Sequence, residues 1–146
     1  LIQESHLVHT QNIRLIFVRG FAYFYEHSAN PRAYFGDDSL ALASYQSPRR
    51  RSKTLDLCAG PGLQVMISAG HANECHGVEI NPFAAQIASF NIAINQQERC
   101  FIHNQSFEEF FKSNTEKFDL VTFNPPLLPV PPGIDYPFVG HGGVDG

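Results

Sequence analysis

The chain is poor in cysteine, lacks any long apolar run and carries fewer basic than acidic residues. Its three cysteines, Cys58, Cys75 and Cys100, form no Cys-x-x-Cys pair, and the histidines form no His-Glu-x-x-His pattern. Zinc sites are built from such pairs. We therefore predict no metal site and expect reduced thiols in a cytoplasmic protein.

No apolar stretch approaches the roughly 20 residues of a membrane-spanning helix, and no secretory signal is present, so we expect no membrane association. The net charge of −4 argues against a binder of duplex nucleic acid, which needs an excess of Lys and Arg. The only basic cluster, Arg49–Lys53, is predicted to be a solvated loop, with a phosphate-backbone contact as the alternative. Because the chain begins with Leu1 rather than Met, we expect its N-terminus to be missing.

The pattern over residues 1–33 favours a helical or irregular segment, with a short strand over Ile13–Val18 before the helix. Asp37–Ser39 then offers an N-cap for a short helix over Leu40–Gln46. We assign residues 34–146 to a single domain.

From Lys53 onward, strand and helix patterns alternate, which is typical of a parallel sheet with crossover helices. The predicted elements are strands over Thr54–Cys58, Cys75–Ile80, Arg99–His103 and Phe118–Phe123, and helices over Leu63–Ala69, Pro82–Asn95 and Phe107–Lys112. The predicted fold class is α/β, with a Rossmann-like, mostly parallel sheet and flanking helices.

A glycine-bearing turn, Ala59–Gly62, follows the first of these strands. Glycine lets the backbone approach a ligand closely at such a turn, and a plain tight turn is the alternative. Val65 occupies the place of the third glycine in Gly-x-Gly-x-x-Gly, which argues against a nicotinamide site. At the end of the next strand, Glu79 is suited to accept both hydroxyls of a ribose.

The fourth strand runs into Asn124-Pro125-Pro126. Consecutive prolines restrict the backbone and leave carbonyls pointing in defined directions, and Asn124 adds an amide oxygen. Together these groups are predicted to hold a planar –NH2 group of a substrate.

These three motifs resemble the class I S-adenosylmethionine-dependent methyltransferases of the Asn-Pro-Pro-Tyr subgroup, over Tyr34 to Gly146. The resemblance implies S-adenosylmethionine as cofactor, with Asn124, Pro125 and Pro126 as the catalytic residues. It implies that the acidic residue Asp56 serves the ammonium end of the methionine portion. The implied cofactor-binding residues are Asp38, Asp56, Cys58, Ala59, Gly60, Gly62, Glu79, Ile80, Ser106, Phe107 and Asn124.

Within the subgroup, Asn124–Pro129 and the tail Gly142–Gly146 resemble enzymes that methylate a glutamine amide of peptide release factors. Leu127 departs from their usual aromatic residue. The leading prediction is methyl transfer to an amide or amine nitrogen of a protein or small molecule. The alternatives are the exocyclic amine of an RNA or DNA base, and a non-catalytic cofactor-binding module. The family's sheet has more strands than these motifs supply, so we expect C-terminal strands to be missing from the chain.

Overall fold

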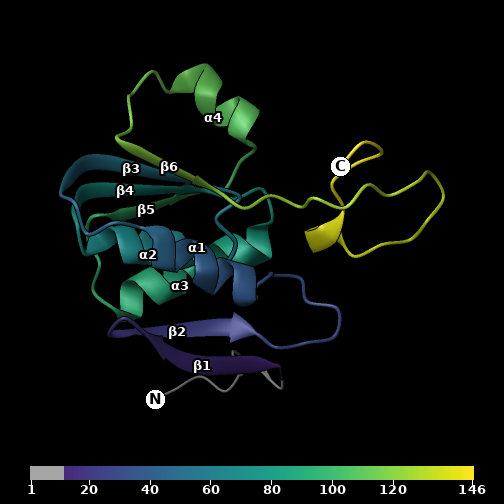
Figure 1. Ribbon diagram of the computed structural model, residues 1–146, viewed down its shortest axis with the longest axis horizontal. Coiled ribbons are helices and arrows are strands. Elements are labelled where there is room, and N and C mark those ends of the chain that lie inside the picture. Colours follow the sequence, from purple (N-terminus) through teal and green to yellow (C-terminus); the bar gives the residue numbers. More distant parts are fainter. Residues whose placement is uncertain (1–11) are drawn as a thin grey trace, which may run out of the picture.

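Four parallel strands form the central sheet of the computed structural model, which describes residues 12–146 (Figure 1). The strands are β3 (Arg51–Leu57), β4 (Ala72–Val78), β5 (Cys100–His103) and β6 (Leu120–Phe123), in the order β5-β4-β3-β6. The chain adds β4 and β5 on one side of β3 and then returns to add β6 on the other. The predicted α/β fold with a parallel sheet is confirmed.

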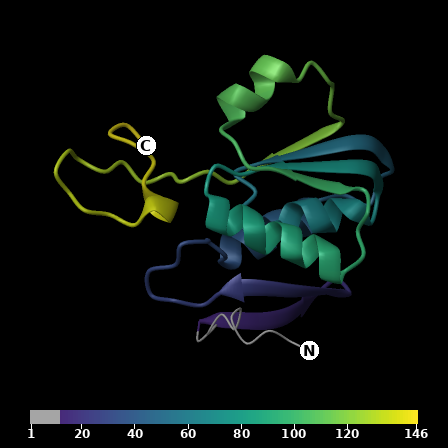
Figure 2. The same ribbon diagram turned by 180° about the vertical axis from the view of Figure 1, so that it is seen from behind.

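Three helices cover one face of this sheet and one helix covers the other (Figures 1 and 2). The first layer consists of α1 (Asp37–Tyr45), α2 (Leu63–Ala69) and α3 (Pro82–Ile94), and α4 (Phe107–Ser113) lies on the opposite face. All seven residues of α2 are buried, because this helix has packing partners on both sides. Within residues 12–146, no helix is long and apolar enough to cross a bilayer.

The N-terminal segment forms a β-hairpin, so the helix predicted after Ile13–Val18 is wrong. Strands β1 (Ile13–Val18) and β2 (Phe21–Glu26) pair antiparallel through a two-residue turn. Arg19 and Gly20 both have positive φ, 47° and 88°, the conformation that a tight hairpin turn requires. The strand over Ile13–Val18 is present as predicted, and residues 1–11 lie outside the described part of the chain.

The hairpin forms a third layer against the helices (Figure 2). Tyr23, almost completely buried, packs in one core cluster with Leu63, Met66 and Ile67 of α2. The fully buried Asn91 of α3 accepts a hydrogen bond from the amide of Phe24 (2.8 Å) and donates to its carbonyl (2.9 Å). The same Asn91 amide donates to the carbonyl of Pro61 at 3.0 Å. One side chain therefore connects the hairpin, α3 and the turn after β3.

Candidate active site at the carboxyl edge of the sheet

A cavity of about 500 Å³ lies where β3, β4 and β6 end. The cavity is lined by Gly60, Glu79 and Asn124, one residue from each of the three sequence motifs. Open parallel sheets bind ligands outside the carboxyl ends of their strands, where the strand order reverses. The chain reverses between β3 and β6, so this cavity occupies that position.

The turn after β3 has an unusual backbone. Cys58, Gly60 and Gly62 all have positive φ, at 57°, 53° and 86°. A Cβ on Gly62 would lie 3.0 Å from Cβ of Ala88, so glycine there permits close packing of the turn on α3. Cys58 adopts this conformation with a side chain, a strained arrangement of the kind concentrated at functional sites. Burial, with the nearby carboxylates of Glu79 and Asp56, raises the pKa of the Cys58 thiol to about 11, so it remains neutral.

Glu79 connects the end of β4 to this turn. One carboxylate oxygen accepts a hydrogen bond from the Gly60 amide at 2.7 Å, and the other accepts from the Asn81 amide at 2.8 Å. A carboxylate oxygen has two acceptor positions, so each oxygen retains one for a ligand. Glu79 is only 7% exposed, and it faces the cavity that Gly60 also lines.

Asp56 lies on β3 beneath the cavity, and Thr122 of β6 is its partner in the strand register. The Thr122 hydroxyl donates to the Asp56 carboxylate at 2.7 Å. Burial raises the pKa of Asp56 to about 7, aided by the charge of Glu79 and opposed by the Thr122 hydrogen bond. A cation bound beside this carboxyl would lower its pKa and favour its ionised form, so the carboxylate could pair with the cation.

Asn124 is held by a chain of side chains from residues far away in sequence. Its amide donates to the Asp38 carboxylate at 2.9 Å, and Asp38 also accepts from the Tyr34 hydroxyl and the Ser39 amide, both at 2.8 Å. Partial burial acts to raise the pKa of Asp38, but these hydrogen bonds outweigh it, so its pKa lies below the ordinary value. An ionised carboxylate only accepts hydrogen bonds, so the –NH2 of Asn124 faces Asp38 and its oxygen is directed away.

The structure brings most of the sequence-predicted site residues to the cavity, but not all of them. Those that line it are Asp38, Asp56, Cys58, Ala59, Gly60, Glu79, Ile80, Asn124, Pro125 and Pro126. Ser106 instead caps α4, where its hydroxyl accepts from the Glu109 amide, and Phe107 packs edge-on to Phe123. Gly62 acts through packing and is not in the lining.

Two parts of the cavity wall were missed from the sequence. One is the segment between the hairpin and α1, where Glu26 accepts hydrogen bonds from the amides of Arg32 and Ala33. The other is the tail, where residues 136–140 return to line the cavity. Neither segment has a periodic pattern, so only the density of proline and glycine marked them as loops.

The glycine-rich tail packs behind the Asn-Pro-Pro loop. The amide of Gly142 donates to the Leu128 carbonyl at 2.9 Å, and the amide of Val130 donates to the Gly143 carbonyl at 2.7 Å. A Cβ on Gly142 would lie 2.9 Å from the carbonyl oxygen of Pro126. A side chain at position 142 would therefore collide with the Asn-Pro-Pro loop, so the first glycine of Gly-Gly-x-Asp-Gly is needed for the tail to pack against the loop. This role does not depend on which substrate receives the methyl group.

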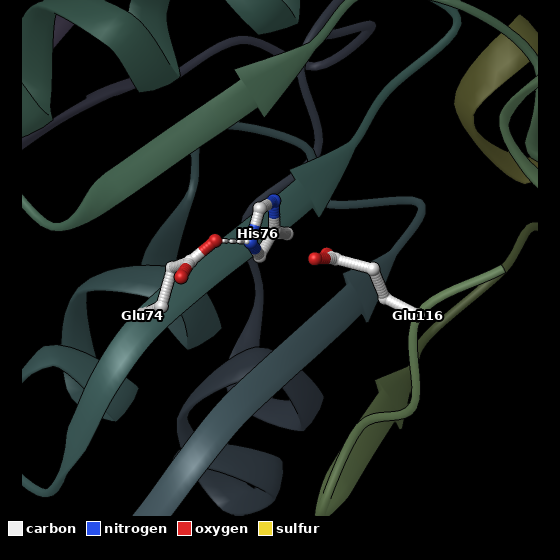
Figure 3. A group of neighbouring side chains, drawn as sticks. All are labelled: Glu74, His76 and Glu116. Carbon is white, nitrogen blue, oxygen red and sulfur yellow. Dashed lines mark hydrogen bonds and ion pairs between the residues drawn. The ribbon is translucent and has the colours of Figure 1, made fainter. Parts of the chain in front are cut away.

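A second polar cluster, Glu74, His76 and Glu116, has the composition of a metal site (Figure 3). The carboxylate of Glu74 contacts Nε2 of His76 at 2.7 Å and the Lys53 ammonium at 3.3 Å. Lys53 also forms an ion pair with Glu116. The lysine therefore supplies the cation for these carboxylates, and the cluster is an ion-pair network on the sheet face that carries α4.

A comparison with protein families identifies the chain. The family model described as "Methyltransferase small domain" matches residues 36–129, which include the glycine turn, Glu79 and the Asn-Pro-Pro loop. The chain belongs to this family. The resemblance to methyltransferases inferred from the motifs is thus confirmed at the level of the family.

Curated relatives of this methyltransferase domain are tRNA-modifying enzymes. The tRNA1(Val) (adenine(37)-N6)-methyltransferase of Yersinia pestis (strain Pestoides F) is 32% identical over 97 residues, which cover 64% of this chain and 39% of that protein. The proteins of Yersinia pseudotuberculosis match equally well. The chain therefore spans about two fifths of the length of these relatives. Their names agree with the RNA-base alternative rather than with a protein glutamine acceptor.

Solved structures confirm the fold. The SAM-dependent methyltransferase from Agrobacterium tumefaciens superposes with a TM-score of 0.62 over 79% of this chain and 40% of that one, at 16% identity. Trm5b from Pyrococcus abyssi gives 0.60 over 80% of this chain and 34% of that one, also at 16% identity. TYW2 from P. horikoshii, solved in complex with MeSAdo, superposes with a TM-score of 0.54 over 68% of this chain and 38% of that one, at 19% identity.

The raised pKa of Asp56 predicts a pH-dependent stability. The folded protein retains this proton up to about pH 7, whereas the ordinary value is 3.8, so stability present at low pH is lost as the pH rises between these values. The slope is at most about 1.4 kcal/mol per pH unit. Asp56→Asn removes this titration, so its free energy of unfolding in urea should rise relative to that of the parent from about pH 4 to about pH 7 and then stay level. Asp37→Asn, on the exposed first turn of α1, is the control. If the difference in free energy of unfolding between Asp56→Asn and the parent stays constant with pH, the raised pKa of Asp56 is contradicted.

Proposed function

We propose that this domain transfers a methyl group from S-adenosylmethionine to the exocyclic amine of a base in RNA, with adenine in tRNA as the first acceptor to test. The observation that carries the proposal is the convergence of the glycine turn, Glu79 and Asn124 on one cavity. Membership of the methyltransferase family and the adenine-N6 specificity of the Yersinia relatives support it. The predicted cytoplasmic location and the domain boundary at residue 34 remain predictions.

The residues at the β3 and β4 ends fit an adenosyl cofactor. Gly60 presents backbone without a side chain, and Glu79 retains one acceptor position on each oxygen, the number that two ribose hydroxyls need. Asp56, below them, offers a carboxyl whose ionisation a bound cation would favour. When bound, S-adenosylmethionine supplies an electrophilic methyl group on a sulfonium. The cavity of about 500 Å³ lies within the usual range for small-molecule sites.

Asn124 and Pro125 form the acceptor side. The amide oxygen of Asn124, turned away from Asp38, and the carbonyl of Pro125 would accept hydrogen bonds from the two N–H groups of the substrate amine. These contacts orient the nitrogen lone pair and stabilise the positive charge that develops on nitrogen during attack. No strong base is needed, because the nitrogen loses its proton after the bond forms. Positioning of this kind can supply about 7–11 kcal/mol of the barrier.

Asp38 serves this acceptor side as a positioning residue. Asp38 accepts three hydrogen bonds within the protein, from Asn124, Tyr34 and Ser39, against two for Glu79, so less of its acceptor capacity is left for the ammonium end of a cofactor. Its function is to hold the Asn124 amide so that the oxygen, and not the –NH2, faces the substrate. We propose this role toward Asn124 in place of the cofactor contact that the sequence predicts for Asp38.

Two aromatic side chains in the cavity lining favour a planar base over a glutamine side chain as the acceptor. Leu127 is 65% exposed and provides no ring, but the returning tail contributes Tyr136 and Phe138 to the lining, exposed to 41% and 61%. Aromatic rings that line the same cavity as Asn124 and Pro125 offer stacking surfaces for a base. The prediction of a release-factor glutamine as acceptor depends on the Gly-Gly-x-Asp-Gly tail. This tail packs against Pro126 and would support the Asn-Pro-Pro loop equally well for a glutamine or for a base.

Replacing Asn124 should separate catalysis from cofactor binding. Asn124→Ala is expected to lower kcat on the order of 100-fold or more, the effect of removing one preorganised hydrogen-bonding group, with the Kd for S-adenosylmethionine unchanged within twofold. The measurements are transfer of a labelled methyl group to tRNA and calorimetric titration of the cofactor. Asn114→Ala, at the end of α4, is the matched control. Wild-type turnover by the Asn124 variant would refute the acceptor assignment. If the wild type methylates a glutamine peptide but no RNA, the proposed RNA acceptor is wrong. If it binds the cofactor but transfers no methyl group to any acceptor, the non-catalytic module is favoured.

The positioning role of Asp38 has its own signature. Asp38→Ala should lower kcat roughly 10-fold or more and leave the Kd for S-adenosylmethionine unchanged. Tyr34→Phe, which removes one hydrogen bond to Asp38, should lower kcat by a smaller factor. In an Asn124→Ala background, Asp38→Ala should cause little further loss, because coupled residues are not additive. A higher Kd for S-adenosylmethionine in Asp38→Ala, with kcat unchanged, would instead identify Asp38 as a cofactor ligand.

A further inference from the structure

Five arginines gather at the opposite end of the sheet from the cavity, around the turn between α2 and β4. The backbone amide of Arg51, at the start of β3, donates to the His71 carbonyl at 2.9 Å, and its guanidinium contacts Nδ1 of His71 at 3.1 Å. The guanidinium of Arg99 donates to the Ala69 carbonyl at 3.2 Å. Arg49 and Arg50 directly precede Arg51 in the chain. We call Arg19, Arg49, Arg50, Arg51 and Arg99 the arginine rim.

Arg19 joins this group through the tertiary structure, not through sequence proximity. It lies in the turn between β1 and β2, and the neighbouring Ala22 amide donates to Asn95 at the end of α3 at 2.9 Å. Burial first, and then the charges of Arg51 and Arg19, lower the pKa of His71, so this histidine is neutral among the arginines. The hairpin thus adds a cation to a surface that the sequence shows only as Arg49–Arg51.

The cations of the rim are largely unneutralised. Among residues 12–146, no side-chain partner is found for the guanidinium groups of Arg19, Arg49 or Arg50, and all three are exposed. Three acidic groups lie near the rim. Asp119 accepts hydrogen bonds from the amides of Ser52 and Lys53, Glu98 precedes Arg99 in the chain, and Glu74 forms an ion pair with Lys53. Half of the ten Lys and Arg residues therefore lie at one end of a chain whose net charge is −4.

We infer that the arginine rim binds the phosphate backbone of the RNA whose base enters the cavity. This inference rests on the proposed function. A chain with a net negative charge repels RNA over most of its surface, so a segregated cationic surface is needed to hold the acceptor. The length of β3, seven residues at about 3.3 Å each, separates the rim from the cavity by roughly 20 Å. Exposed guanidinium groups without acidic partners are suited to phosphate, which they bind in a bidentate manner.

The test is the salt dependence of RNA binding. Each phosphate contact contributes about 0.7 to 0.9 to the slope of log K against log [salt], so a variant carrying Arg49→Ala and Arg50→Ala should show a slope smaller by about 1.4 to 1.8. The probe is an unmodified tRNA1(Val) transcript in filter binding at several salt concentrations. The control variant loses the same charge at Arg14 and Lys112, on β1 and α4, away from the α2–β4 turn. Thermal melts check that both variants fold.

The outcomes separate this inference from the proposed function. A reduced slope and a raised KM for RNA in the rim variant only, with the Kd for S-adenosylmethionine unchanged, would support it. An unchanged slope, or equal changes in both variants, would overturn it, because RNA would then respond to net charge alone. Because binding is measured without turnover, a wild-type protein that binds the transcript through the rim but methylates no RNA would refute the proposed function and not the rim.

Discussion

The hydrogen bond between the Glu79 carboxylate and the Gly60 amide is the contact on which the site depends. It joins the ends of two adjacent parallel strands and sets the turn after β3 at a fixed place relative to β4. The positive φ angles of Cys58, Gly60 and Gly62 curve this turn around the carboxylate, and Asn91 holds the turn from below through the Pro61 carbonyl. A backbone without side chains and a partly unsatisfied carboxylate therefore face the same cavity.

A second set of contacts connects this half of the site to the other. Asn124 follows β6, and Asp38 lies in the first turn of α1, 86 residues earlier. Their hydrogen bond closes the cavity between the Asn-Pro-Pro loop and the segment before α1, and the tail supports the loop from behind through Gly142. The N-terminal hairpin contributes indirectly, since Glu26 holds the amides of Arg32 and Ala33 at the cavity wall. The cavity is thus built from segments distributed over the described chain.

The parts of the fold with strong local signals could be predicted from the sequence. Helix α2 begins and ends at the predicted residues, and the other sheet strands and helices differ by a few residues at their ends. The hairpin was mistaken for a helix because its aromatic residues have no clear period and Arg19–Gly20 is a weak turn signal. The motifs located Gly60, Glu79 and Asn124, because strand ends in a parallel sheet share an edge. The Asp38–Asn124 contact, the returning tail and the arginine rim could not be predicted, because each depends on tertiary packing between distant segments.

The acceptor side is where the comparisons changed the interpretation. The motif resemblance alone favoured a protein glutamine, whereas the curated relatives modify adenine in tRNA and the tail places two aromatic side chains at the cavity. Both readings require the same arrangement of donor and amine sites. They differ in what surrounds the amine, where the tail contributes Tyr136 and Phe138 to the cavity lining.

Calorimetric titration of S-adenosylmethionine into the wild type and into Glu79→Gln tests the central claim most directly, with Glu108→Gln on the exposed first turn of α4 as control. We predict saturable 1:1 binding by the wild type and the control, and at least 10-fold weaker binding by Glu79→Gln, which loses a charged acceptor for the ribose hydroxyls. Absence of binding by the folded wild type, or equal affinity in all three proteins, would contradict the account.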